Sequence, residues 1–86
     1  MGSSAKTVSH AVKQLFAGRD QEIDLAFRED PAFGALCRDY LACMDALERW
    51  RVSDSESAPQ RVAEYAELLE ELALEVATHL QKYGRP

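Results

Sequence analysis

Two cysteines and two histidines are the side chains of this sequence best suited to binding a metal ion. They are Cys37, Cys43, His10 and His79. The cysteines are six residues apart on one predicted helix, which places them about 120° apart around its axis, so they cannot pair with each other within it. Their spacing matches neither a zinc knuckle nor a redox Cys-x-x-Cys pair. We interpret both as buried, reduced structural thiols; convergence of all four residues on a metal ion is the alternative.

The other reactive side chains form no catalytic motif. A carboxylate-bridged di-iron bundle uses Glu-x-x-His, but Val76 is three residues before His79, and Glu75 is four residues before it. The serines lack a partnered base, and the sequence has no glycine-rich phosphate-binding loop. We therefore predict that the protein is not an enzyme and has no catalytic, cofactor-binding or metal-binding residues. His79 is predicted to be a partly buried histidine at the boundary of a helical core.

The 86 residues suffice for one small domain, and they carry a formal net charge of −5. Most of this imbalance lies in residues 53–86, which contain three basic and seven acidic side chains. Nucleic acid is not an expected partner, because a basic patch is missing.

No apolar run approaches the roughly 18 residues of a membrane span, and no signal-peptide core opens the chain, so we expect a cytoplasmic protein without a membrane partner. Residues 1–4 are either a remnant of an expression tag or a native start.

Two long stretches predict a pair of helices, over residues 31–52 and 58–83, because an apolar residue recurs every three or four positions. The acidic, serine-rich segment 53–57 is short enough to turn the second helix back on the first. The prediction is an all-α protein built on an antiparallel helical hairpin. The repeating positions are Phe33, Leu36, Tyr40, Cys43, Leu47 and Trp50 in the first helix, and Val62, Tyr65, Leu69, Leu72, Val76 and Tyr83 in the second.

Local signals predict where the two hairpin helices begin and end. Asp30 can accept backbone N–H bonds as an N-cap, and Pro31 suits the first helical position. Ser57 and Gln60 have the spacing of a capping box at the start of the second helix. Gly84 is a candidate for the residue that ends this helix at the C′ position.

A further helical segment is predicted before the hairpin, over residues 5–17, with Ser3 or Ser4 available as its N-cap. Gly18 follows this segment, and the apolar pattern resumes beyond it. Gly18 is therefore either a C′ residue or a weak point inside a longer helix. The expectation is either one helix bent near Gly18 or two short helices.

The apolar face of each hairpin helix spans about 180° around the helix axis, whereas a surface helix has an apolar stripe only slightly over 100° wide. Each helix therefore has apolar surface left after it has covered the other. The N-terminal segment can cover part of it, which gives a three-helix unit, and a second copy can cover the rest, which gives a dimeric bundle. Leu74 adds a candidate contact outside this face, because it falls within the arc of Glu64, Glu67, Glu70 and Glu71.

The start of the hairpin resembles a known family. The residues that carry the resemblance are Asp30, Phe33, Leu36 and Tyr40, followed by Leu47, Glu48, Arg49 and Trp50. They are similar to the opening of small bacterial helical-hairpin proteins of unknown function, typified by YdcH. The lysine-rich turn and second helix common in that family are missing here, where the second helix is rich in glutamate. The resemblance implies a helical hairpin fold and carries no active-site residues that could be transferred.

The most direct functional prediction is a small bacterial protein–protein interaction or self-association module. It would act through its wide apolar helix faces, as a homodimer or bound to another protein. One alternative is a metal- or small-ligand-binding helical bundle that uses Cys37, Cys43, His79 and the aromatic residues. Another is an acidic regulator that binds a basic partner through the glutamate-rich face of its last helix.

Overall fold

The computed structural model describes residues 5–84 and folds them into four helices and no strands. In chain order they are α1 (Ala5–Leu15), α2 (Asp20–Glu29), α3 (Pro31–Arg51) and α4 (Ala58–Gln81). The predicted all-α fold is confirmed. Ser3 and Ser4, the candidate N-caps of the first helix, lie outside the described residues.

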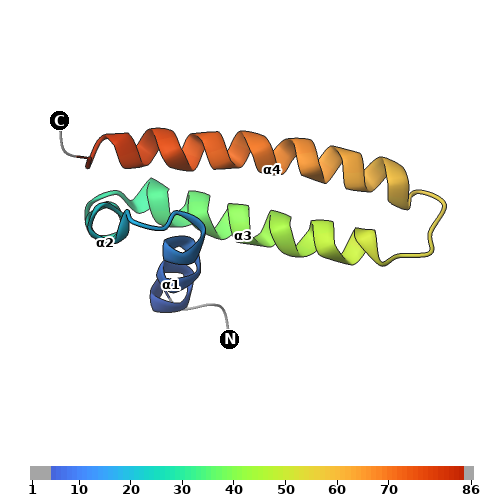
Figure 1. Cartoon of the computed structure of the whole chain (residues 1–86), viewed down its shortest axis with the longest axis horizontal. Coiled ribbons are helices and arrows are strands. Elements are labelled where there is room, and N and C mark those ends of the chain that lie inside the picture. Colours follow the sequence, from blue (N-terminus) through green and yellow to red (C-terminus); the bar gives the residue numbers. More distant parts are fainter. Residues whose placement is uncertain (1–4, 85–86) are drawn as a thin grey trace.

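α3 and α4 form the predicted antiparallel hairpin and lie side by side along the long axis of the molecule (Figure 1). Both helices begin at the predicted residue and end slightly earlier than predicted. Beyond α4 the chain tightens, because Lys82, Tyr83 and Gly84 donate backbone N–H bonds of 3.0–3.3 Å to carbonyls three residues back. The prediction that Gly84 ends the helix at the C′ position is wrong, because the C-cap is Lys82 and the next residue is Tyr83; Gly18 is the only described residue with a positive φ. The tightened turn already satisfies the last carbonyl groups.

The predicted N-cap of α3 is confirmed. Asp30 has an extended backbone, with φ −126° and ψ 98°, and its Oδ1 accepts a hydrogen bond of 3.0 Å from the backbone N–H of Ala32. Pro31 occupies the first turn, where its missing N–H costs no helical hydrogen bond. A single non-helical residue, Asp30, therefore separates α2 from α3 and turns the chain sharply.

The predicted capping box at the start of α4 is wrong. Ser57 has a helical backbone conformation, with φ −79° and ψ −11°, and its side chain caps no N–H. An N-cap requires a non-helical backbone to aim its side chain back at the first turn. Ser57 is instead part of the turn, where its N–H donates to Ser55 Oγ at 3.1 Å, and Gln60 Nε2 donates to Glu64 at 3.2 Å.

The N-terminal segment forms two short helices rather than one bent helix. α1 ends at Leu15 and α2 begins at Asp20, so the chain changes direction over four residues. Gly18 makes this change of direction possible, because its φ of +87° is a conformation that residues with a side chain rarely adopt.

The main core lies at the open end of the hairpin, where α3 begins and α4 ends. There α1 packs against α2 and α3, while α2 packs against α1, α3 and α4 (Figure 1). Phe27 and Phe33 meet edge to face, with ring centroids 5.1 Å apart. The buried residues of this core are Val8, Val12, Ile23, Ala26, Phe33, Cys37, Tyr40, Val76 and Leu80.

The other half of the hairpin, next to the turn at residues 52–57, consists of α3 and α4 alone (Figure 1). We call it the turn half and define it as residues 43–51 of α3 and 58–68 of α4. Its buried side chains are Cys43, Leu47 and Ala58, which stand apart from the main core. Two helices can bury only the seam between them, so the outer parts of their apolar faces stay at the surface.

Candidate functional site

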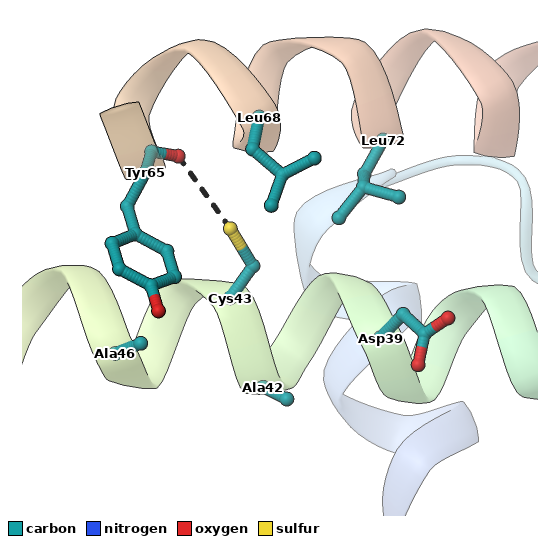
Figure 2. A pocket seen from close by; sticks show the side chains of 7 residues that line it. All are labelled: Asp39, Ala42, Cys43, Ala46, Tyr65, Leu68 and Leu72. Carbon is teal, nitrogen blue, oxygen red and sulfur yellow. Dashed lines mark hydrogen bonds between the residues drawn. The ribbon is translucent and has the colours of Figure 1, made fainter. Parts of the chain in front are cut away.

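The most distinctive surface feature is a groove between α3 and α4 that runs from the middle of the hairpin into the turn half. One section of it is lined by Asp39, Ala42, Cys43, Ala46, Tyr65, Leu68 and Leu72 (Figure 2). The next section is lined by Ala46, Arg49, Trp50, Ser53 and Tyr65. The two sections share Ala46 and Tyr65 and therefore adjoin, and we call them together the α3–α4 groove.

Small residues on α3 explain why the groove exists. Ala42 and Ala46 are one helical turn apart on α3, and each lines the groove with only a methyl group. Opposite them, α4 contributes the larger side chains of Tyr65, Leu68 and Leu72. Leu68 is 42% exposed although it belongs to the apolar face of α4. The groove is therefore apolar along its middle and unfilled by any residue of the described chain.

Charged residues stand toward opposite ends of the groove. Asp39 lines the section nearer the core, and Arg49 lines the section nearer the turn. Both are exposed on the surface of α3. Arg49 forms an ion pair with Asp45 on the same helix, and this contact raises the pKa of Arg49 further. The groove thus has a carboxylate toward one end, an apolar middle and, toward the other end, a guanidinium that is paired with Asp45.

Cys43 lies on the floor of the groove but is not poised for chemistry. It is buried, and its Sγ donates a hydrogen bond of 3.5 Å to the backbone carbonyl of Tyr65 (Figure 2). Burial raises the pKa of the Cys43 thiol, and it raises the pKa of Cys37, in the main core, to about 12. A thiol with so high a pKa holds little of the reactive thiolate at neutral pH. Both cysteines are free and buried, which confirms the prediction that both thiols are buried.

His79 is partly buried, as predicted, and its partner is Asp30. The Nδ1–H of His79 donates to Asp30 Oδ2 at 3.0 Å, while Oδ1 of the same carboxylate caps α3. The His79 ring also lies near Phe33, at a centroid distance of 6.3 Å. The hydrogen bond from His79 is the main reason that the pKa of Asp30 lies below its ordinary value. Sequence reasoning missed this pair, although an antiparallel hairpin brings the start of α3 and the end of α4 together.

The four candidate metal ligands do not assemble into a site. His10 is exposed on α1, where its Nε2 lies 3.2 Å from Gln14 Nε2, and His79 is engaged with Asp30. Within the part of the chain that the structure describes, no group of three or more His, Cys, Asp or Glu side chains could hold a metal ion.

The outward face of α4 is acidic and includes one large apolar side chain. Leu74 is 69% exposed, between glutamates on the surface that points away from α3. It lies outside the α3–α4 groove. Leu74 and Leu68 are thus two exposed leucines of the same helix in different surroundings, which makes them useful for comparison.

Comparison of the chain with protein-family models, with curated proteins and with solved structures finds no match. The relationship to YdcH-like hairpin proteins therefore stays a prediction. No helix among the described residues combines the length and the apolar character that crossing a membrane requires.

Proposed function

We propose that the protein is a small cytoplasmic association module, without enzymatic activity, whose working surface is the α3–α4 groove. A second copy of the chain covers this groove, so that two hairpins form a dimeric helical bundle. The observation that carries the proposal is the unfilled apolar groove, which runs from the middle of the hairpin into the turn half and leaves Leu68 42% exposed. Burying it removes apolar surface from water, which is the main driving force of association.

The charge distribution favours a second copy as the occupant. α3 carries three basic and three acidic side chains, so two α3 helices can approach without net repulsion. α4 carries one basic side chain, Arg61, and five glutamates, so two α4 helices would repel each other if they met face to face. An interface centred on α3 suits two identical chains for this reason. The alanines in the groove support the same arrangement, because small side chains let helices pack closely.

Sedimentation equilibrium over a concentration series, from low to high micromolar, tests the proposal directly. We expect the wild-type chain to change from monomer to dimer over this range. Leu68→Glu should weaken dimerisation by at least about tenfold, because a carboxylate in a closed apolar interface loses its hydration without gaining a partner. A wild-type chain that remains strictly monomeric at high micromolar concentration would contradict the proposal.

Leu74→Glu is the matched control, since it makes the same substitution on the same helix outside the groove. It should leave the dimerisation constant within about twofold, because surface substitutions away from an interface have small effects. If Leu74→Glu weakens association and Leu68→Glu does not, the acidic face of α4 is the contact surface and the groove is not.

A further inference from the structure

We infer that Asp39 and Arg49 determine how the second copy is oriented: the two α3 helices lie antiparallel, with Asp39 of each copy facing Arg49 of the other. The inference rests on the proposed self-association through the α3–α4 groove and adds the arrangement of the partner. It assigns a specificity role to two charges of α3 that are exposed at the groove.

The spacing along α3 carries the argument. Asp39, Ala42, Ala46 and Arg49 follow each other at steps of three, four and three residues, so they lie on one side of the helix, and all four line the groove. Asp39 and Arg49 are about 15 Å apart along the helix axis, at about 1.5 Å per residue. The midpoint of this row is residue 44, and the alanines are symmetric about the same point.

A two-fold axis through this midpoint pairs the residues in a complementary way. It places each Asp39 level with Arg49 of the second copy, and each Ala42 level with Ala46 of the second copy. The opposite charges attract at both ends, while the methyl groups allow close approach in the middle. The same residues therefore serve as both halves of the interface, as a two-fold dimer requires.

A parallel arrangement does not fit these residues. Two parallel α3 helices in register would place Asp39 against Asp39 and Arg49 against Arg49, and like charges at close range oppose binding. The row of charges thus favours the antiparallel pair and disfavours the parallel one. This combination of attraction and repulsion is the usual means by which helices select a partner orientation.

The ion pair that Arg49 makes within its own helix does not prevent this contact. The side chains of Arg49 and Asp45 are 76% and 62% exposed, and ion pairs in such surroundings are weak and easily rearranged. A guanidinium group has five N–H donors. Arg49 can therefore keep Asp45 as a partner and also reach Asp39 of a second copy, or exchange one for the other.

Charge reversal in matched pairs tests the inference. We expect Asp39→Arg alone and Arg49→Asp alone each to weaken self-association by about tenfold, because two attractions become two repulsions in the dimer. The double variant Asp39→Arg/Arg49→Asp should recover most of the wild-type affinity, since each end is again complementary. An equimolar mixture of the two single variants should form a heterodimer with near wild-type affinity. Sedimentation equilibrium provides the affinities, and circular dichroism verifies that each variant remains helical.

Arg51→Asp is the control for a general effect of charge. Arg51 is an exposed arginine of α3 that pairs with Glu48 and does not line the groove. The Arg51→Asp variant should leave the dimerisation constant within about twofold.

The inference is overturned if the double variant stays as weak as the single variants, or if the mixture does not form a heterodimer. If the wild type dimerises but neither single variant weakens the dimer, the proposed orientation is wrong and the proposed self-association stands. A wild type that is strictly monomeric would contradict both the orientation and the self-association.

Discussion

Asp30 joins two parts of the chain that are 49 residues apart. Its Oδ1 caps α3 and its Oδ2 accepts a hydrogen bond from His79 on α4, so one carboxylate starts a helix and also secures the end of another. The capping role was predictable because it depends on residues 30–32 alone. The contact with His79 was not, because it depends on how far α4 extends after the turn.

The pH dependence of stability reports on this carboxylate. Asparagine is also a good N-cap, so Asp30→Asn keeps the cap and removes the charge that faces His79. The native pKa of Asp30 lies below its ordinary value of 3.8, so the unfolded chain takes up this proton at higher pH than the native chain. The stabilisation is therefore present above pH 3.8 and is lost as the pH falls through the native value. We expect Asp30→Asn to unfold at lower urea concentration than the wild type at pH 6, and the difference to shrink below pH 3.8.

Asp54→Asn is the control for that measurement, because Asp54 is an exposed carboxylate in the turn between α3 and α4. It should change the urea midpoint little at either pH. Equal midpoints for Asp30→Asn and the wild type at pH 6, or a difference that does not vary with pH, would show that the carboxylate has no stabilising contact with His79.

Among the elements, the join between α1 and α2 depends most strongly on one residue type. Gly18 has a φ of +87° and lies in open space, since an added Cβ there would meet no atom within 4 Å. Glycine is therefore favoured at position 18 by the backbone conformation and not by a lack of space for a side chain. Gly34 is the reverse case: it lies inside α3, where an added Cβ would contact Arg38 and Phe27 at 3.7–3.8 Å, which is an ordinary packing distance.

The same substitution at these two glycines should therefore have opposite effects. We expect Gly18→Ala to lower the free energy of unfolding by about 1–2 kcal/mol, the cost of a left-handed backbone for a residue with a Cβ. Gly34→Ala should raise it by about 0.5–1 kcal/mol, because alanine favours the helix interior and the site has room for a methyl group. Urea unfolding of both variants checks these values, and a Gly18→Ala variant as stable as the wild type would mean that α1 and α2 can be joined differently.

Helix boundaries show which local signals are reliable in this chain. Asp30 and Pro31 constrain the backbone themselves, so the start of α3 was predicted correctly. Ser57 and Gln60 only offer side chains, and the helical backbone of Ser57 prevents the capping box that their spacing suggests. Gly84 permits a left-handed conformation without requiring it, and the chain adopts a tightened turn instead.

At the scale of the whole molecule, the hairpin is covered unevenly. α1 and α2 build the main core at its open end, whereas the turn half has only the seam between α3 and α4 (Figure 1). A chain of 86 residues buries a smaller fraction of its surface than a larger domain does, so its stability as a monomer is limited. Covering the turn half with a second copy would add stability where one chain has least.

Thermal unfolding should accordingly depend on protein concentration. For a dimer that unfolds to monomers, mass action raises the melting temperature with concentration, and we expect a rise of about a few degrees per tenfold increase for a chain of this size. Differential scanning calorimetry at several concentrations measures it. Leu68→Glu should reduce the concentration dependence over the same range, and Leu74→Glu should preserve it. A wild-type melting temperature that does not vary with concentration would contradict the proposed dimer.

The sequence by itself determined the helices, the hairpin and the identity of the buried thiols. These follow from interactions between residues three or four positions apart and from the short turn at 53–57, and such interactions are the same in any compact arrangement of the chain. The width of the apolar faces also indicated that some surface would remain uncovered.

Only the tertiary structure decided where that surface lies. The change of direction at Gly18 and the sharp turn at Asp30 bring α1 and α2 to the open end of the hairpin, which leaves the α3–α4 groove unfilled beside Leu68. The same folding brings Asp30 to His79 and places Asp39 and Arg49 toward opposite ends of one groove. These outcomes depend on the path of the backbone between helices, which a repeat of apolar residues along each helix does not specify.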